Sequence, residues 1–418
     1  MISRVLIVGA GIAGPTLAYW LLRAGITPTL LESAPSLRTG GYMIDFWGPG
    51  YTVAERMGLL PRLLDVGYAI REMRVVDRHF RPRITFGTQA LQRALGDRFV
   101  SVLRGDLAQL LYHSLNGEVE TLFGNEVRSL VQHEGGVDVE LAYRETRRFD
   151  LVIGADGVHS GVRNLMFGAG GALERDLGYR VAAFTAGKYP YRDDLVYVTR
   201  TIPGRQVARC ALRDDRTVFF MIMSSELIAR YDMSSVTHQK CALGDVLADI
   251  GAERGAILHA LDSSEDFYFD VVSQAHVPRW SSGRIALIGD AAYGPSFLAG
   301  EGASLAMTGA YMLAGELATA ANAGAAFVNY EHRLRSYAER KQRLALRMGS
   351  WFVPHSWLGV WVRNRITELA SIPLLSKLFL RSLVRDDLSL RQQVPQWTAR
   401  AAARRVSTAL GRVRTIGS

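Results

Sequence analysis

Three glycines near the start of the chain have the spacing of a turn that holds a nucleotide diphosphate. Gly9, Gly11 and Gly14 form the pattern GxGxxG. The apolar run 5–8 before them predicts a buried parallel strand, and residues 15–24 after them predict a helix. In such a turn the first glycine permits the tight bend, the second lets a pyrophosphate approach the backbone, and the third lets helix and strand pack closely. The N–H groups at the start of the helix, with their partial positive charge, suit the phosphates.

An acidic residue stands at the end of the next predicted strand, residues 27–32. Glu32 follows Gly14 by 18 residues, and a carboxylate in this place can accept hydrogen bonds from ribose hydroxyls. The same charge would repel a 2′-phosphate, so the site disfavours NADP as its resident nucleotide. A GxGxxG pattern alone is a weak signal, and a glycine turn without a ligand is the alternative. The strand, helix and acid in register favour a dinucleotide site.

Two further segments place carboxylates directly after predicted buried strands. Residues 150–163 read DLVIGADGVHSGVR and carry Asp156; residues 283–307 read GRIALIGDAAYGPSFLAGEGASLAM and carry Asp290. Ligands bind at the carboxyl edge of such sheets, so both side chains are candidate cofactor contacts. A turn position for Asp156 and a helix N-cap position for Asp290 are the alternatives.

With GxGxxG in front, these segments resemble the three fingerprints of the class A FAD-dependent monooxygenases, the para-hydroxybenzoate hydroxylase-like family, over most of residues 1–320. The resemblance implies bound FAD, with NAD(P)H as a transient co-substrate in the same cleft. It implies that NAD(P)H reduces FAD and that O2 then gives a C4a-hydroperoxyflavin, whose distal oxygen passes to a small-molecule substrate. The alternative is an FAD-dependent reductase or dehydrogenase on the same fold.

A finer resemblance concerns the substrate. Residues 40–58, 178–184 and 267–317, with the helical C-terminus, are similar to the tetracycline-inactivating branch of this family. That similarity implies oxygenation of an aromatic or polycyclic compound, such as a polyketide or a tetracycline, and hence antibiotic modification. Hydroxylation and Baeyer–Villiger insertion both stay open.

The resemblance also implies roles for single residues. Asp290 matches the acid that hydrogen-bonds a ribityl hydroxyl of FAD, and Pro295 matches the proline beside the flavin ring on the substrate side. Gly300 and Gly302 match glycines that let the backbone approach the pyrimidine end of the flavin. No residue is assigned as catalytic, and Pro295 and Gly300 are only placed near the flavin ring. The predicted cofactor contacts are Gly9, Gly11, Ala13, Gly14, Glu32, Arg38, Arg104, Asp156, Asp290 and Gly302.

The chain departs from the family pattern at the flavin loop. Glu301 and Ser304 stand where the family often has Gln and Asn, and Ser33 stands where it often has Arg. Glu301 adds a negative charge near a flavin that itself becomes anionic. We therefore expect Glu301 either to face solvent or to shift the redox potential of the flavin.

The elements that must position these residues predict an α/β fold. It consists of a Rossmann-type FAD-binding domain, an inserted, mostly antiparallel β-sheet substrate domain and a helical C-terminus. The FAD-binding domain would comprise residues 1–72, 100–177 and 278–324; the substrate domain 73–99 and 178–277; and the C-terminal helices with a basic tail 325–418. Within these, single helices are predicted at 49–65 and 242–251.

The predicted substrate pocket lies between the flavin and the inserted sheet. Candidate lining residues are Tyr179, Phe219, Phe220, Met221 and Met223, and a core position is the alternative for each. The histidines at 159, 276 and 355 are not assigned as general bases, because a lone histidine is more often a packed or surface residue.

The C-terminus is rich in aromatic and basic residues. Trp351, Phe352, Trp357 and Trp361 could cap the substrate entrance, contact a membrane surface or bury a dimer interface, and capping or packing is preferred to weak membrane contact. Two further apolar faces are predicted here, on residues 358–369 and 375–383. Six arginines after Asp387 contribute much of the net charge of +9. A solvated tail is preferred to nucleic-acid binding, and the oligomeric state stays open.

Composition bounds the remaining classes. The only cysteines are Cys210 and Cys241, and no His/Cys cluster predicts a metal site. So few cysteines are typical of a protein in the reducing cytoplasm. No apolar run reaches the length of about 18–20 residues that a membrane span requires.

Overall fold

A six-stranded sheet carries the GxGxxG turn. The computed structural model describes residues 2–38, 40–89, 95–96, 98–142, 144–168, 173–370, 388 and 390. Five neighbouring strands of the six-stranded sheet run parallel, and the sixth strand, β17, pairs antiparallel at one edge. The order is β7 (Glu120–Phe123), β2 (Thr27–Glu32), β1 (Arg4–Val8), β11 (Leu151–Gly154), β18 (Ile285–Leu287) and β17 (Ser281–Ser282).

Helices bury this sheet. Helix α1 (Ala13–Arg23) follows the glycine turn and packs against α10 (Gly302–Thr319), where the ring of Trp20 meets the edge of Tyr311 at 4.9 Å. Nearly all of α10 is buried, which explains why its sequence is apolar all round. Three more helices belong to this layer: α5 (Arg104–His113), α6 (Gly161–Phe167) and α9 (Asp290–Tyr293). It also contains a three-stranded sheet of β8 (Val127–His133), β9 (Gly136–Leu141) and β10 (Thr146–Phe149). A two-stranded sheet of β3 (Met43–Trp47) and β6 (Phe99–Leu103) completes it.

The single helix predicted over 49–65 is wrong. The structure has two helices there, α2 (Pro49–Arg56) and α3 (Leu60–Val66). Gly58 between them has a φ of +72°, a left-handed conformation that favours glycine and ends the first helix. The second helix begins anew with a proline in its first turn, a position that proline suits.

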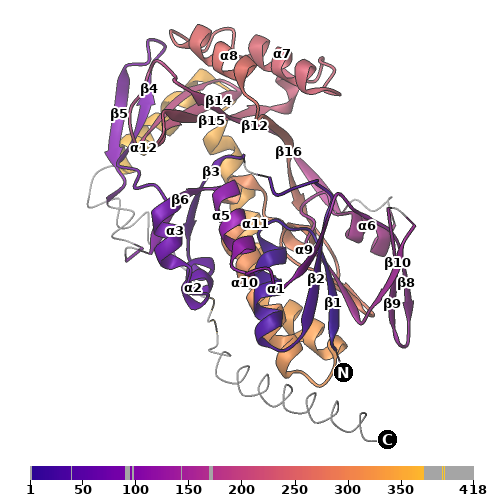
Figure 1. Ribbon diagram of the computed structural model, residues 1–418. Helices are drawn as coiled ribbons and strands as arrows, with labels where there is room; N and C mark the ends of the chain where they lie inside the picture. Colours follow the sequence, from indigo (N-terminus) through magenta and orange to yellow (C-terminus); the bar gives the residue numbers. More distant parts are fainter. Residues whose placement is uncertain are drawn as a thin grey trace, which may run out of the picture.

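A seven-stranded sheet forms the second layer, above the first in Figure 1. Its neighbours pair antiparallel except β13 and β4, which run parallel. The order is β16 (Tyr268–Ala275), β12 (Glu174–Gly187), β15 (Arg216–Ser224), β14 (Arg205–Ala211), β13 (Val196–Ile202), β4 (Glu72–Val76) and β5 (Pro82–Gly87). The α/β fold with a mostly antiparallel second sheet is confirmed; the domain boundaries stay a prediction.

One face of this sheet, called the outer face here, is covered by α7 (Val236–Val246) and α8 (Arg254–Ser263) (Figure 1). The short η1 (Ser225–Leu227) follows β15. The helix predicted at 242–251 is misplaced, because α7 begins earlier, where the Ser235 hydroxyl accepts a hydrogen bond from the His238 N–H. The next helix, α8, was not predicted.

Strand alternation divides the residues predicted to line the pocket. Phe219, Met221 and Met223 point to the outer face and pack under α7 and α8, so for these three the core alternative holds and they do not line the predicted pocket. Phe220 and Tyr179 lie on the opposite, inner face, with Leu298 from the flavin-loop segment.

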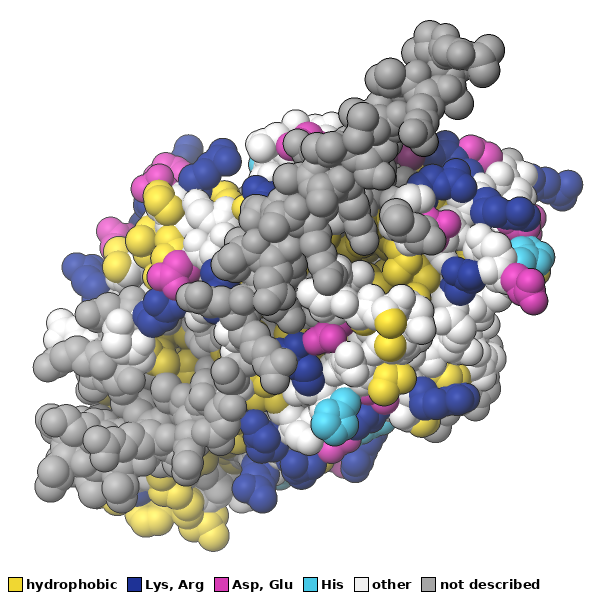
Figure 2. Space-filling model, turned by 90° about the horizontal axis from the view of Figure 1, so that it is seen from below, with side chains coloured by type: hydrophobic (Ala, Val, Ile, Leu, Met, Phe, Trp, Pro, Cys, Tyr) yellow, Lys and Arg dark blue, Asp and Glu magenta, His cyan; other side chains and the backbone are white. Residues whose placement is uncertain are grey.

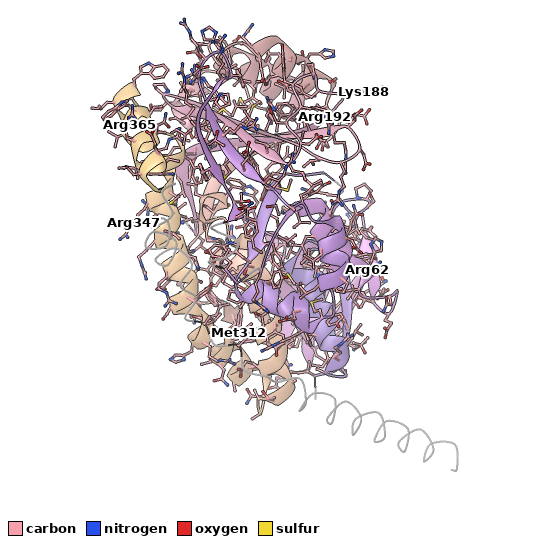
Figure 3. The ribbon with its side chains drawn as sticks, turned by 90° about the vertical axis from the view of Figure 1, so that its left-hand side faces the viewer. Arg62, Lys188, Arg192, Met312, Arg347 and Arg365 are labelled. Carbon is pink, nitrogen blue, oxygen red and sulfur yellow. The ribbon has the colours of Figure 1, made fainter. Side chains whose placement is uncertain are left out.

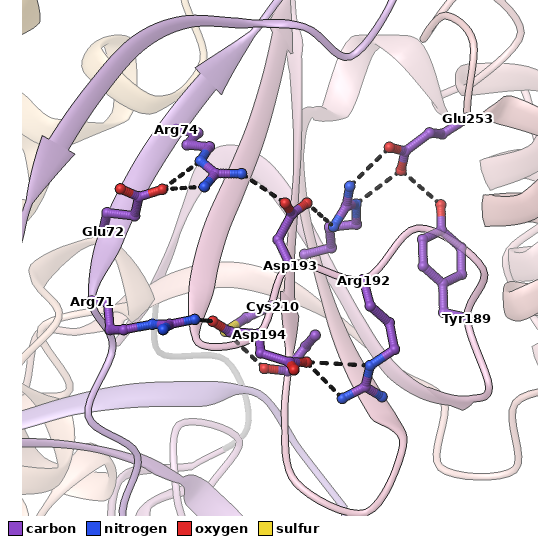
Figure 4. A network of polar contacts seen from close by, with 11 residues as sticks. Arg71, Glu72, Arg74, Tyr189, Arg192, Asp193, Asp194, Cys210 and Glu253 are labelled. Atoms are coloured by element: carbon purple, nitrogen blue, oxygen red, sulfur yellow. Dashed lines mark hydrogen bonds and ion pairs between the residues drawn. The ribbon is translucent and has the colours of Figure 1, made fainter.

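The outer face also holds a buried ion-pair network. The Arg209 guanidinium donates to both oxygens of Glu253 at 2.8 Å, and Tyr189 donates to the same carboxylate at 2.8 Å. Asp193 links this group onward to Arg74 (Figure 4). These charges are paired among themselves and lie away from the inner face.

The C-terminal helices connect the two layers. Helix α11 (Ala323–Phe352) packs on α10 and on η2 (Phe297–Ala299), and after Pro354 the chain continues as α12 (Trp357–Ala370), which packs on β13 and β5. Figure 3 shows this helical column along one side, with Arg347 and Arg365 projecting outward.

The predicted apolar face of α12 does not pack on the sheet. The members of this face are exposed: Leu358, Val362, Ile366 and Leu369. Trp357 and Trp361 beside them are exposed as well. The predicted face 375–383 and the six tail arginines lie outside the described residues. No described helix is long and apolar enough to cross a membrane. On the described part of the face drawn in Figure 2, basic and acidic side chains are interspersed.

Candidate active site

The glycine turn is shaped partly by packing and partly for a ligand. Gly9 has a φ of +108°, and a Cβ there would lie 2.5 Å from the Ala155 carbonyl oxygen. A Cβ on Gly14 would overlap the Gly9 carbonyl oxygen. At Gly11, by contrast, the nearest atom to a Cβ would be Nη2 of Arg104, at 3.9 Å. Gly9 and Gly14 are thus required by the protein's own packing, whereas Gly11 opens toward the site.

The predicted ribose acid is held at the edge of this turn. Glu32 Oε2 accepts from the Ala10 N–H and Oε1 from the Ala34 N–H, each at 2.9 Å. These bonds fix the carboxylate beside the glycine turn and leave lone pairs for further donors. This geometry suits a ribose whose two hydroxyls donate to one acid.

Two opposite charges border the site without pairing. Arg104 starts α5, and the side chains of Arg104 and Asp290 have no hydrogen bond or ion pair with any described residue. Burial raises the pKa of Asp290, and the Arg104 guanidinium partly opposes that rise. A Cβ on Gly302 would come within 3.8 Å of Asp290 Oδ1. A polyhydroxylated diphosphate such as FAD fits this donor and acceptor set, because its phosphates suit the cation and its ribityl hydroxyls suit the carboxylate.

The flavin-loop segment leads from Asp290 to α10. Pro295 is buried, and its carbonyl oxygen accepts from Gln274 Nε2 at 2.9 Å. Gly300 has a φ of +68° with open space around a Cβ. Helix α10 then begins at Gly302 with no side-chain cap and no acid in its first turn. Its free N–H groups can therefore stabilise negative charge at the pyrimidine end of a reduced flavin.

The carboxylate of Asp156 serves the protein itself. It accepts from the Ser160 hydroxyl at 2.5 Å and from the Val162 N–H at 3.0 Å, which caps α6. Its backbone lies against Gly9, so it supports the glycine turn. Arg38 is exposed with no partner among the described residues, and Ala13 lies beside Gly289 at the start of α1. Direct FAD contacts by these three residues stay predictions.

Two departures from the family pattern have structural explanations. Glu301 is 4% exposed and pairs with Lys341 Nζ at 2.6 Å, which excludes the first of its two alternatives, a side chain facing solvent. The partner comes from α11, which sequence spacing did not indicate. An effect of Glu301 on the redox potential of the flavin stays a prediction. Ser304 accepts from the Gly50 N–H at 2.9 Å and holds the start of α2 against α10.

Aromatic rings from the flavin-loop segment and from the inner face contact one another. Phe220 stacks on Phe297 at 4.4 Å, and Tyr42 meets the edge of Phe297 at 4.9 Å. Tyr42 also contacts Phe220 and Tyr268 at about 6 Å. The backbone N–H of Arg104 donates to the Tyr42 carbonyl, so these rings lie beside a predicted cofactor contact.

Asp45 lies on β3, three residues after Tyr42. Burial raises the pKa of its carboxyl, and the Ser101 hydroxyl, which donates to Asp45 Oδ1 at 2.6 Å, opposes the rise. Burial also raises the pKa of Tyr197, and the nearby charge of Asp45 adds to that rise. Sequence reasoning missed Tyr42 and Asp45. The available signal was a lone carboxylate in the otherwise apolar strand MIDFW.

The three histidines considered from the sequence each contact another side chain. His159 lies between Glu174 at 3.1 Å and Asp270 at 2.9 Å, and chiefly the bond to Asp270 raises its pKa to about 9. His159 is therefore cationic at neutral pH and ties the β11 loop to the second sheet. His276 contacts Gln274, and His355 is exposed beside Tyr179.

Comparison with known proteins agrees with this geometry. A family model described as an FAD binding domain matches residues 3–348. The chain is 34% identical over 378 residues to a flavin-dependent monooxygenase of an unknown prokaryotic organism, covering 89% of this chain and 92% of that protein. It is 33% identical over 368 residues to a flavin-dependent monooxygenase of Legionella longbeachae, covering 84% and 90%. The crystal structure of the tetracycline destructase Tet(55) matches with a TM-score of 0.80 and 30% identity, covering 93% and 99%. The glycine turn, the unpaired Arg104 and Asp290, and these relatives together show that the chain belongs to the FAD-binding-domain family and is an FAD-dependent monooxygenase.

Proposed function

We propose that this enzyme consumes NAD(P)H and inserts one oxygen atom from O2 into an aromatic or polycyclic small molecule, with polyketides and tetracyclines as the leading class. The observation that carries the proposal is the set of aromatic rings, Tyr42, Phe220 and Phe297, beside the flavin loop. Flat aromatic side chains beside the flavin loop suit stacking against a planar substrate. The likeness to a tetracycline destructase supports the same substrate class.

The chain's residues position and shield the reactants. Bound FAD supplies the redox chemistry that activates O2. Glu32, Arg104 and Asp290 would hold the cofactor, and the N-terminus of α10 would stabilise negative charge that develops on it. The protein around Asp45 desolvates its carboxyl, and in this proposal the same surroundings keep bulk water from the substrate and limit side reactions of activated oxygen.

NAD(P)H reaches the flavin transiently in this proposal. Among the described residues the GxGxxG turn of β1 and α1 is the one strand–turn–helix unit of its kind, and Glu32 and Arg104 commit it to FAD. A nicotinamide must therefore approach through the cleft that later receives the substrate.

The test measures NADH and NADPH oxidation by the FAD-loaded enzyme with phenols, polycyclic polyketides and tetracyclines, under 16O2 and 18O2. We expect at least one compound to accelerate oxidation and to yield a product heavier by one oxygen atom, with the label from O2. Phe220→Leu should raise KM for that compound. Phe219→Leu, on the opposite face of the same strand, is the matched control and should leave KM unchanged.

An FAD-dependent reductase or dehydrogenase is the second candidate function. It would oxidise NAD(P)H with a compound of the panel while the product contains no 18O. That result would overturn the proposed oxygen insertion and leave FAD binding in place.

A further inference from the structure

Arg363 on α12 is a buried cation without an acidic partner. It is 8% exposed, and its Nε and Nη2 atoms have no hydrogen-bond partner. Nη1 alone makes a long hydrogen bond, 3.4 Å, to Gln206 Oε1. Burial is the whole cause of the lowered pKa of Arg363, about 10, and no carboxylate opposes it. The side chain is therefore still charged at neutral pH.

The other deeply buried arginines of the described residues are paired. Arg209 makes the bidentate contact with Glu253, and Arg163 donates to two backbone carbonyls and to Glu174. Buried charges in proteins are normally compensated in this way, because an unpaired charge in a low-dielectric interior is strongly destabilising. Arg363 lacks that compensation within the described part of the chain.

Arg363 lies on the inner face of the seven-stranded sheet. Gln206 pairs with Ile222 across β14 and β15, and Ile222 packs with Leu298 of the flavin loop. Phe220 lies on the same face, two residues along β15 from Ile222. Helix α12 thus carries its one buried arginine onto the sheet face that borders the proposed substrate space.

Polar donors converge around this guanidinium. Gln206 Oε1 accepts from the Thr201 hydroxyl at 2.9 Å and from Arg363. The amide nitrogen of Gln206 has no acceptor among the described residues. Two buried guanidinium nitrogens and one amide nitrogen therefore have no acceptor among the described residues. The set matches an anionic oxygen acceptor with more than one lone pair, such as a carboxylate or an enolate.

We infer that Arg363, with Gln206, binds an anionic oxygen group of the substrate and thereby selects substrates that carry a carboxylate or enolate beside their ring system. The inference rests on the proposed function for the ring system of the substrate. The anionic group of the substrate is inferred independently, from Arg363 and Gln206. The inference gives α12 a role in substrate recognition, while its outward side carries Arg365 (Figure 3).

The test uses binding rather than turnover. The probes are 1-hydroxy-2-naphthoate and its uncharged amide, titrated into FAD-loaded protein and followed by calorimetry and by the visible spectrum of the flavin. We expect the carboxylate to bind and Arg363→Met to weaken it about tenfold or more, the usual consequence of losing a charged hydrogen-bond pair. Binding of the amide should change less than threefold. Arg365→Met, on the exposed side of the same helix, is the matched control and should behave as wild type.

Thermal stability separates recognition from a structural role. Without probe, Arg363→Met should unfold at the same temperature as wild type or higher, because it removes an uncompensated charge. A Tm lower than that of Arg365→Met would overturn the inference, as would failure of the carboxylate to bind or equal binding in Arg363→Met. Charge-dependent binding without any oxygenated product would instead sustain this inference and count against the proposed reaction.

Discussion

Replacing two aspartates, one at a time, distinguishes cofactor binding from structural support. Asp290 and Asp156 each follow a strand of the six-stranded sheet, and the sequence predicts that both contact FAD. The structure separates them, since Asp290 has no partner among the described residues whereas Asp156 caps α6 through Ser160 and Val162. Asp290→Ala should therefore weaken FAD binding, and Asp156→Ala should mainly lower stability.

The size of each effect follows from these contacts. A hydrogen bond to a charged group contributes about 1.5–3 kcal/mol. Loss of the ribityl contact at Asp290 should thus raise the Kd for FAD about 10- to 100-fold. Loss of the two capping bonds at Asp156 should cost about 1–3 kcal/mol of folding free energy. For a chain of 418 residues, that corresponds to a Tm lower by about 1–3 °C.

The assay is FAD titration of the apoprotein, followed by flavin fluorescence, together with thermal unfolding of the same apoprotein. We expect Asp290→Ala apoprotein to unfold at or above the wild-type Tm, because burial raises the pKa of that carboxyl and the Arg104 guanidinium opposes the rise only in part. Asp156→Ala should bind FAD within about threefold of wild type, a difference below 1 kcal/mol. Equal loss of FAD affinity in both variants would refute the reasoning.

Two further predictions concern the glycine turn and an ion pair between the layers. Gly11→Ala apoprotein should keep the wild-type Tm but lose FAD binding. Gly14→Ala should instead lower the Tm, because its methyl group would overlap the Gly9 carbonyl oxygen and reduce the free energy of unfolding by about 1–3 kcal/mol or more. Apoprotein unfolding and flavin fluorescence separate the two, and an unfolded Gly11→Ala would contradict the distinction. Chiefly through its bond to Asp270, His159 has a pKa raised from 6.5 to about 9, so its stabilising effect is complete below the unfolded value and disappears as pH rises through the folded value. The Tm difference between wild type and His159→Gln should therefore be largest near about pH 6 and absent above about pH 10; a difference independent of pH would show that packing, not charge, accounts for it.

Local chemistry made the cofactor site predictable from sequence. GxGxxG with Glu32 and Asp290 could be read directly, because each constraint on the turn acts within one strand–turn–helix unit or at one strand end. The division between Gly11 and the other two glycines was also expected, since each role follows from what a Cβ would meet. The break at Gly58 was missed because the hydrophobic pattern continues on both sides of a residue whose left-handed φ only the folded chain displays.

The substrate side depended on contacts between distant segments. Phe219 and Phe220 are adjacent and chemically identical, and only the register of β15 in its sheet decides which one faces the flavin loop. Glu301 is neutralised by Lys341, which lies 40 residues later on another helix.

The range of the contacts along the chain separates what the sequence by itself determined from what only the tertiary structure decided. Sequence determined the FAD fold and the binding turn, because those depend on residue types at fixed local spacing. Tertiary structure alone decided which aspartate is free for the cofactor and that Arg363 is buried without a counter-charge. Pairing and burial depend on which distant side chains the packed elements bring within a few ångströms of each other, and local spacing carries no record of that.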